Sequence, residues 1–227
     1  MEEQTILHLH GFLSSAQSTK ARFFAERFAG RAGVAFHAID FSPTPRDFEY
    51  LTVTGMINRL RQFVLDRSLV GEDAGAMAIV GSSLGGLVAV QYADRFGGVE
   101  RMVLLAPVLR WFSGGLLGEE EMRAWEEAGV ATVPHPAFER EVPLRFHLEL
   151  DGRLYREPVA PAAPTFIVHG RGDETVPVAH SRSYAEAFPE QVSLMEVDAG
   201  HDLNAHLDGI WDEVRAFLLG GAADPSA

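Results

Sequence analysis

Short apolar runs alternate with amphipathic stretches along most of the chain. Short, mostly apolar runs bounded by turn residues are typical of buried strands, and they occur at residues 5–9, 34–39, 77–80, 102–105, 166–168 and 194–197. Apolar positions at helical spacing predict helices at residues 18–28, 54–68, 84–96, 178–188 and 203–218. Strands that alternate with helices form right-handed βαβ units. We therefore expect an α/β fold with a mainly parallel sheet of about six strands and helices on both faces.

The alternation stops between Pro107 and Pro164. Within this stretch, residues 119–128 predict a short amphipathic helix, and residues 146–157 predict a β-hairpin that turns at Asp151-Gly152. We expect residues 1–219 to form a single domain in which residues 108–163 are a small cap insertion. Residues 220–227 are expected to be a flexible tail.

The charge balance narrows the class of partner. A formal net charge of −13 disfavours nucleic acid and anionic membranes, which an acidic surface repels, and no local cluster of Lys or Arg offsets it. The chain has no cysteine, so disulfides and thiolate chemistry are excluded. Residues 74–93 are uncharged and as long as a membrane span, but their glycines and central serines favour a buried strand, turn and helix. With no signal-like N-terminus, we expect a cytoplasmic protein.

A G-x-S-x-G pattern, Gly81-Ser82-Ser83-Leu84-Gly85, lies between the third predicted strand and the helix that follows it. In that context a sharp turn holds the central serine in a strained conformation, with its Oγ exposed above the edge of the sheet. Glycines on either side allow close approach of the chain, and the helix N-terminus provides positive potential beside a developing oxyanion. The pattern predicts Ser83 as a nucleophile, the alternative being a Gly/Ser-rich turn without chemistry.

A serine nucleophile needs a general base, and His201 is the candidate among nine histidines. It lies in Asp198-Ala199-Gly200-His201-Asp202, after the last predicted strand and before the last predicted helix. His169 ends a strand and adjoins Gly170, so we expect it to shape the turn there. Of the other histidines, His180 and His206 fall on predicted helices, His37 lies within a strand, and His135 and His147 lie in the cap insertion.

The base in turn needs a carboxylate that orients its ring and stabilises its cation. Asp173 follows the fifth predicted strand in a tight loop, and the resulting chain order is nucleophile, acid, base. Asp198 and Glu174 are the rival carboxylates, but Asp198 is very close in sequence to His201 and Glu174 should point away. Capping of the next helix is the alternative role for Asp173.

Two N–H donors near the nucleophile would complete an oxyanion hole. One is the backbone N–H of Leu84. The other should come from the loop after the first strand, where Phe12 is the candidate and Leu13 the alternative. In the cap insertion, Trp111, Phe112 and Leu116 flank a Gly-Gly pair, so they could form a mobile apolar lid that binds substrate. Packing of the cap onto the body is the alternative.

Together these motifs resemble the α/β-hydrolase superfamily over nearly the whole chain. Within it, His10-Gly11-Phe12-Leu13-Ser14-Ser15 with Lys20-Ala21, and Gly81-Ser82-Ser83-Leu84-Gly85-Gly86, are similar to small YqiA-type esterases. The resemblance implies hydrolysis of short acyl esters by Ser83, Asp173 and His201. The sequence departs from the superfamily in lacking the leading antiparallel hairpin, so the sheet should be small.

These observations predict a serine esterase that acts through an acyl-enzyme on a small-molecule ester. Metal-ligand spacing is absent, so no cofactor is expected. A thioesterase, a peptidase or a carbon–carbon bond hydrolase would use the same residues. A non-catalytic binding protein on this scaffold is the alternative from another class.

Overall fold

The computed structural model of the chain describes residues 4–71, 75–112 and 118–220. Its centre is a six-stranded sheet in which every neighbouring pair of strands is parallel. The strands lie in the order β2-β1-β3-β4-β7-β8, with bounds β1 Gln4–Leu9, β2 Val34–Ile39, β3 Met77–Ser82, β4 Arg101–Leu105, β7 Thr165–Gly170 and β8 Val192–Val197. The predicted fold class and all six predicted strands are confirmed.

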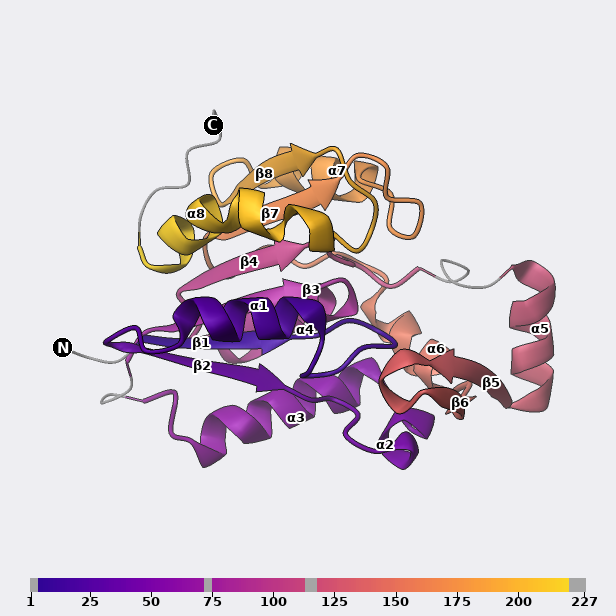
Figure 1. Cartoon of the computed structure of the whole chain (residues 1–227). Helices are drawn as coiled ribbons and strands as arrows, with labels where there is room; N and C mark the ends of the chain where they lie inside the picture. Colours follow the sequence, from indigo (N-terminus) through magenta and orange to yellow (C-terminus); the bar gives the residue numbers. More distant parts are fainter. Residues whose placement is uncertain (1–3, 72–74, 113–117, 221–227) are drawn as a thin grey trace.

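Helices cover both faces of the sheet (Figure 1). One face packs against α1 (Thr19–Phe28) and α8 (Leu207–Leu218), and the other against α3 (Val53–Asp66), α4 (Leu84–Phe96) and α7 (Ala179–Ala187). Successive side chains of a strand point to opposite faces. Ile6 of β1 therefore packs on the side of α1 and α8, and Leu7 packs on the side of α3, α4 and α7. Strands β3 and β7 are buried along their whole length, as expected for a parallel sheet covered on both sides.

The carboxyl ends of the strands meet at one edge of the sheet. In Figure 1 the arrowheads of β1 to β4 point toward the part of the chain formed by α5, β5, β6 and α6. We call residues 108–163, which contain these elements, the cap segment. In open parallel sheets the residues that carry chemistry follow the strands at this edge.

The cap segment differs in part from its prediction. The predicted helix is present as α5 (Glu119–Ala128), which has three glutamates in its first turn. The hairpin predicted at residues 146–157 is wrong: this stretch forms α6 (His147–Gly152) and a 3₁₀ turn, η2 (Arg153–Tyr155). The hairpin lies earlier, where β5 (Val130–His135) pairs with β6 (Arg140–Arg145) through η1 (Pro136–Phe138).

Tertiary contacts explain why Asp151-Gly152 does not form the hairpin turn. The Asp151 carboxylate accepts hydrogen bonds from the Thr54 backbone N–H, at 2.8 Å, and from the Thr54 hydroxyl, at 2.6 Å. Asp151 therefore accepts a hydrogen bond from a free backbone N–H group in the first turn of α3, a helix that is distant from it in sequence. Gly152 lies against the ring of Trp111, where a Cβ atom would come within 2.3 Å of the indole. Both residues serve long-range contacts that a local turn pattern does not report.

Two other segments differ from their predictions, and one predicted segment is not described. A short helix, α2 (Pro45–Glu49), follows β2 and was not predicted, although Thr44 caps it and Asp47 completes the capping box. The last predicted helix divides into η3 (Asn204–His206) and α8. The predicted tail lies, beyond Gly220, outside the described residues.

The uncharged stretch at residues 75–93 forms β3, a turn and most of α4, and all of it is buried except residues 75, 76 and 83, which are partly buried. Among the helices in the described ranges, none combines the length and the apolar character needed to cross a bilayer.

Candidate active site

Ser83 lies at the turn between β3 and α4 in a backbone conformation that non-glycine residues rarely adopt. Its φ is 52° and its ψ is −118°, and positive φ is a marker of local strain. The turn is held by the Ser83 N–H, which donates to the Leu105 carbonyl at 3.0 Å, and by the Ser83 carbonyl, which accepts from Gly86 and Val108. The surrounding structure therefore stabilises the strained turn.

The glycines of the motif are required by close packing of the chain. A Cβ atom on Gly85 would lie 2.2 Å from the Leu9 carbonyl oxygen, and one on Gly81 would lie 2.7 Å from the Gly85 carbonyl oxygen. These distances are far below van der Waals contact. The end of β1 can approach the start of α4 only because position 85 has no side chain, and this approach places the loop after β1 beside Ser83.

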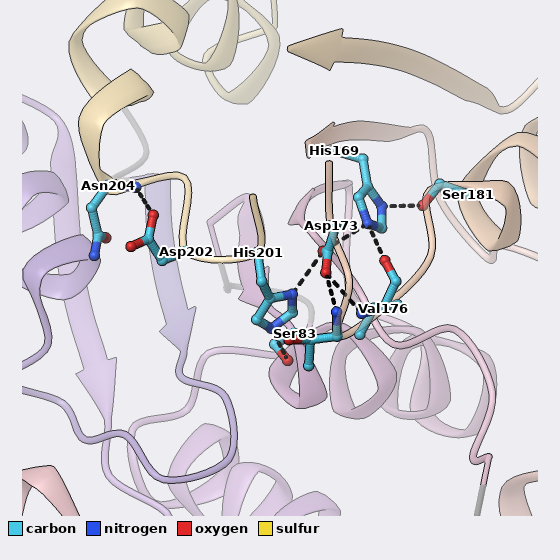
Figure 2. A network of polar contacts seen from close by, with 9 residues as sticks. Ser83, His169, Asp173, Val176, Ser181, His201, Asp202 and Asn204 are labelled. Atoms are coloured by element: carbon cyan, nitrogen blue, oxygen red, sulfur yellow. Dashed lines mark hydrogen bonds and ion pairs between the residues drawn. The ribbon is translucent and has the colours of Figure 1, made fainter. Parts of the chain in front are cut away.

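Ser83, His201 and Asp173 meet at the carboxyl edge of the sheet (Figure 2). His201 Nε2 lies 3.0 Å from Ser83 Oγ, and His201 Nδ1 lies 2.7 Å from Asp173 Oδ2. Since an ionised carboxylate only accepts hydrogen bonds, Nδ1 carries the proton and Nε2 is free to accept one from the serine hydroxyl. The sequence motifs named these three residues, and the structure brings them into one hydrogen-bonded chain.

The Asp173 carboxylate is buried, and both of its oxygens accept hydrogen bonds. Its Oδ1 accepts the N–H groups of Thr175, at 2.9 Å, and Val176, at 2.8 Å. Burial by itself would raise the pKa of Asp173, but hydrogen bonds from two histidines and from the Val176 N–H lower it by more, so the pKa lies well below its usual value. The group therefore stays ionised at neutral pH. The rival carboxylates, Glu174 and Asp198, are exposed.

The second histidine on Asp173 is His169, whose role the sequence analysis did not identify. Its Nε2 lies 3.0 Å from Asp173 Oδ2 and 2.8 Å from the Val176 carbonyl oxygen. Both partners are acceptors, so Nε2 carries the proton, and Nδ1 bonds the buried hydroxyl of Ser181 at 2.8 Å. In Figure 2 the His169 ring lies on the side of Asp173 opposite Ser83. The spacing of four residues between His169 and Asp173 was the signal that could have found it.

The loop after β1 passes directly beside Ser83. A Cβ atom on Gly11 would lie 3.0 Å from Ser83 Cβ, so this loop packs closely against Ser83. The imidazole of His10 stabilises the loop, because its Nε2 accepts the Phe41 N–H at 3.0 Å and its Nδ1 donates to the Gly11 carbonyl at 2.8 Å. Histidine 10 is thus a second residue with a positioning role that the sequence analysis did not assign.

Backbone N–H groups with no acceptor among the described residues lie around Ser83. They belong to Leu84, the first residue of α4, and to Phe12 and Leu13 of the loop. Leu13 has a φ of 53°, which turns the loop sharply next to the serine. Both loop residues line the same cavity as Ser83, so Phe12 and Leu13 both remain candidates for the second oxyanion donor.

An apolar cavity of about 490 Å³ opens over Ser83 and His201. One wall comes from the sheet edge, with Phe12, Leu13 and Val176. The other wall comes from the cap segment and consists of large apolar side chains: Trp111, Met122, Trp125, Val133, Leu144 and Leu148. Concave, largely apolar pockets with few polar groups are typical of small-molecule binding sites.

Two of the three cap residues predicted to bind substrate lie in this cavity. Trp111 and Phe112 both line it, while Leu116 lies outside the described residues. The Trp111 indole is held by a hydrogen bond of 2.9 Å from its Nε1 to the buried carboxylate of Glu149, which also accepts from Arg153 Nε at 3.1 Å. Trp111 is therefore a fixed wall of the cavity.

The chain is similar to one protein family over nearly its whole length. The model of a family described as "Uncharacterised protein family (UPF0227)" matches residues 5–218. No curated protein matches the chain.

Several solved structures share the fold throughout. Est1E from Butyrivibrio proteoclasticus, solved with ferulic acid bound, is 18% identical with a TM-score of 0.75, covering 98% of this chain and 91% of that one. Alpha/beta hydrolase domain-containing protein 10 from mouse is 22% identical, with a TM-score of 0.67 and coverage of 92% and 90%. A putative hydrolase of the α/β superfamily from Xanthomonas campestris is 25% identical, with a TM-score of 0.61 and coverage of 96% and 97%. These likenesses establish an α/β-hydrolase fold.

Proposed function

The chain belongs to the UPF0227 family of α/β-hydrolase proteins, and from this premise we propose that it is a serine hydrolase that cleaves carboxylic esters through an acyl-enzyme on Ser83. The observation that carries the proposal is the hydrogen-bonded chain from Ser83 Oγ through His201 to Asp173, with distances of 3.0 and 2.7 Å. A non-catalytic binding protein would not need a strained serine in contact with a base that a buried carboxylate orients.

The geometry supports the following first half-reaction. Ser83 Oγ attacks the ester carbonyl carbon while its proton passes to His201 Nε2, and the carbonyl oxygen becomes an oxyanion. The N–H of Leu84 and that of Phe12 or Leu13 donate to this oxygen. Asp173 stabilises the imidazolium that forms and does not take its proton. When the carbon–oxygen bond breaks, the leaving alcohol takes the proton from His201, and the acyl group stays on Ser83.

Water completes the cycle by the same route in reverse. His201 Nε2 removes a proton from the water as its oxygen attacks the acyl carbon, and a second oxyanion forms at the same place. Breakdown of this intermediate returns the proton to Ser83 Oγ and releases the carboxylic acid. No group other than the ester, the water and the three side chains is needed for the atoms and charges to balance.

A fluorophosphonate probe tests this proposal without knowledge of the natural substrate. Such a probe forms a stable bond only with an activated serine, so we expect one adduct per chain, on the peptide that contains Ser83. Peptide mass spectrometry locates the adduct, and prior acid denaturation of the protein should prevent it. An intact protein that remains unlabelled would favour the binding-protein alternative.

The apolar cavity supports an apolar acyl group as the part of the ester that binds beneath the cap segment. Val133 of β5 lines the cavity, whereas Val130 on the same strand is 37% exposed and lies outside it. Val133→Trp should fill the space where a longer acyl chain would lie. We expect it to lower kcat/KM for p-nitrophenyl octanoate relative to acetate by about tenfold or more.

Val130→Trp is the matched control for that prediction, because it adds the same indole to an exposed position of the same strand. It should leave the octanoate-to-acetate ratio unchanged. If Val133→Trp also left the ratio unchanged while the variant remained folded by circular dichroism, the acyl group would have to bind elsewhere.

A further inference from the structure

The chain contains a single lysine, Lys20, and the other 18 of its 19 Lys and Arg residues are arginine. Lys20 is the second residue of α1 and is half-buried. Within the described ranges its ammonium makes no hydrogen bond and no ion pair. The mechanism above uses the first part of the motif that contains it, Gly11 to Leu13, but leaves Ser14, Ser15 and Lys20 without a role.

Lys20 lies in a polar pocket of about 380 Å³ on the side of the loop that faces α1. Hydroxyl groups of Ser14, Ser15 and Ser18 line this Lys20 pocket together with the cationic side chains of Lys20 and Arg22. No described residue that lines it is acidic, although the protein as a whole carries a formal net charge of −13. Two cations line this pocket and no lining residue is a carboxylate, although Asp202 interacts with Lys20 and Asp40 lies 3.6 Å from His10 Nε2 at its periphery.

His8 presents an unpartnered polar group to the same pocket. This β1 residue is 0% exposed, lines the pocket, and neither of its ring nitrogens has a hydrogen-bond partner among the described residues. Burial, together with the charges of His10 and Lys20, lowers its pKa to about 3, so the ring is neutral and carries one N–H donor. Leaving such a donor buried and unsatisfied costs about 1–3 kcal/mol, so the His8 N–H needs a hydrogen-bond acceptor in the pocket, either a water or an oxygen atom of a ligand.

The N-terminus of α1 adds further donors. The Ser18 hydroxyl caps the N–H of Ala21, whereas the N–H groups of Thr19 and Lys20 have no acceptor within the described residues. The positive end of the helix dipole favours negative charge at this point. Phe24, one turn further along α1, packs near the His8 ring at a centroid distance of 6.1 Å, which places Lys20 on the helix face above the end of β1.

We propose that the Lys20 pocket binds an oxyanion, either a phosphate or a carboxylate group. Lys20 supplies the charge, the serine hydroxyls and the free N–H groups supply hydrogen bonds, and the His8 N–H closes the inner end. The sequence showed no cluster of basic residues here, because Lys20 and Arg22 are the two cationic residues of the pocket and the remaining donors are hydroxyl, imidazole and backbone groups.

The pocket adjoins the candidate active site through the loop after β1. Gly11 lines the Lys20 pocket and contacts Ser83, while Leu13 lines both the Lys20 pocket and the apolar cavity. The oxyanion could therefore be a group of the substrate whose ester lies at Ser83, a possibility that rests on the proposed function. It could also be a free anion, which would bind whether or not the protein is an esterase.

Asp202 offers a competing explanation for Lys20. Its carboxylate attracts the ammonium and raises the pKa of Lys20, although burial lowers that pKa by more. Asp202 adjoins His201 and lies, with Asn204, on the side of His201 away from Asp173 (Figure 2). If Lys20 served only to hold this loop, the pocket would bind no anion.

The single lysine makes a direct test possible. We would measure reductive methylation of Lys20 with formaldehyde and a cyanoborohydride by peptide mass spectrometry, in phosphate and in sodium chloride of equal ionic strength. A bound anion slows modification by the factor 1 + [L]/Kd, which is about tenfold at ten times Kd. The α-amino group of the chain is the internal control and should react equally in both salts. Equal reactivity of Lys20 at every concentration of phosphate, and of acetate in a parallel series, would overturn the proposal.

Matched substrates distinguish the two sources of the oxyanion. The butyrate esters of 2-hydroxyethyl phosphate and of 2-methoxyethanol differ in the phosphate group. If the substrate carries the anion, Lys20→Met should lower the ratio of their kcat/KM values by about tenfold or more. Arg31→Met, which removes an exposed cation beyond the other end of α1, should leave the ratio unchanged.

Two further outcomes are informative. Protection of Lys20 by phosphate with an unchanged substrate ratio in Lys20→Met would assign the pocket to a free anion. Protection in a protein that hydrolyses neither ester would support the anion site and contradict the esterase proposal. Because protection is measured on the unmodified sequence, it does not depend on whether Lys20→Met folds.

Discussion

Replacing Ser83 with alanine should lower ester turnover by a factor on the order of 10⁴ or more. The substitution removes the hydroxyl that lies 3.0 Å from His201 Nε2 and leaves the Cβ atom, the turn and the backbone donors in place. Residual hydrolysis would come only from the oxyanion donors and from binding, with water as the nucleophile. Turnover of p-nitrophenyl butyrate, measured with circular dichroism to verify folding, tests this result.

Ser183→Ala is the matched control, because Ser183 is an exposed residue of α7 and its substitution removes a hydroxyl that does not line the cavity. It should retain full activity. Substantial turnover by a folded Ser83→Ala protein, in preparations free of contaminating esterase, would defeat the assignment of Ser83 as nucleophile.

Asp173→Asn should lower kcat/KM by a factor of about 10⁴ at neutral pH while the protein remains folded. The reason lies in the four hydrogen bonds that Asp173 accepts. Its Oδ1 accepts two backbone N–H groups, which cannot reverse their polarity, so the amide oxygen of asparagine must take that position. The amide NH₂ then faces His201 Nδ1 and His169 Nε2, which both donate in the native protein.

The conflict between donors forces a change of tautomer in His201. With Nδ1 as acceptor, the proton moves to Nε2, and His201 then donates to Ser83 Oγ instead of accepting its proton. His169 cannot relieve the conflict, since its Nε2–H also serves the Val176 carbonyl oxygen. The substitution thus removes the general base by reversing one hydrogen bond.

Asp198→Asn and Glu174→Gln are the controls, since both carboxylates are exposed neighbours of the site in sequence. Each should change kcat/KM by less than about threefold, as expected for a surface substitution that leaves the local structure unchanged. A mild effect of Asp173→Asn, combined with a large effect of either control, would transfer the orienting role to the other carboxylate.

Local patterns predicted most of the fold, because the spacing of apolar residues in a strand or an amphipathic helix reflects which of its residues are buried. The uninterrupted apolar run at the start of β3 and the G-x-S-x-G motif after it are adjacent in sequence, so the pattern is recognisable locally, although contacts with Leu105, Val108 and Leu9 hold the turn. The helix α5 was predicted with its observed bounds because its acidic first turn and the glycine after it are local signals. The hairpin was misplaced because Asp151 and Gly152 are used in contacts with Thr54 and Trp111.

The sequence by itself determined the order of strands and helices, the position of the elbow serine, and the candidates for base and acid, because each of these depends on neighbours along the chain. Only the tertiary structure decided that His169 shares the carboxylate with His201, that cap residues form the wall of an apolar cavity, and that Lys20, His8 and three serines surround one polar pocket. These arrangements depend on distances between segments that are far apart in sequence. Residue type and spacing do not encode such distances until the sheet and its two layers of helices bring the segments together.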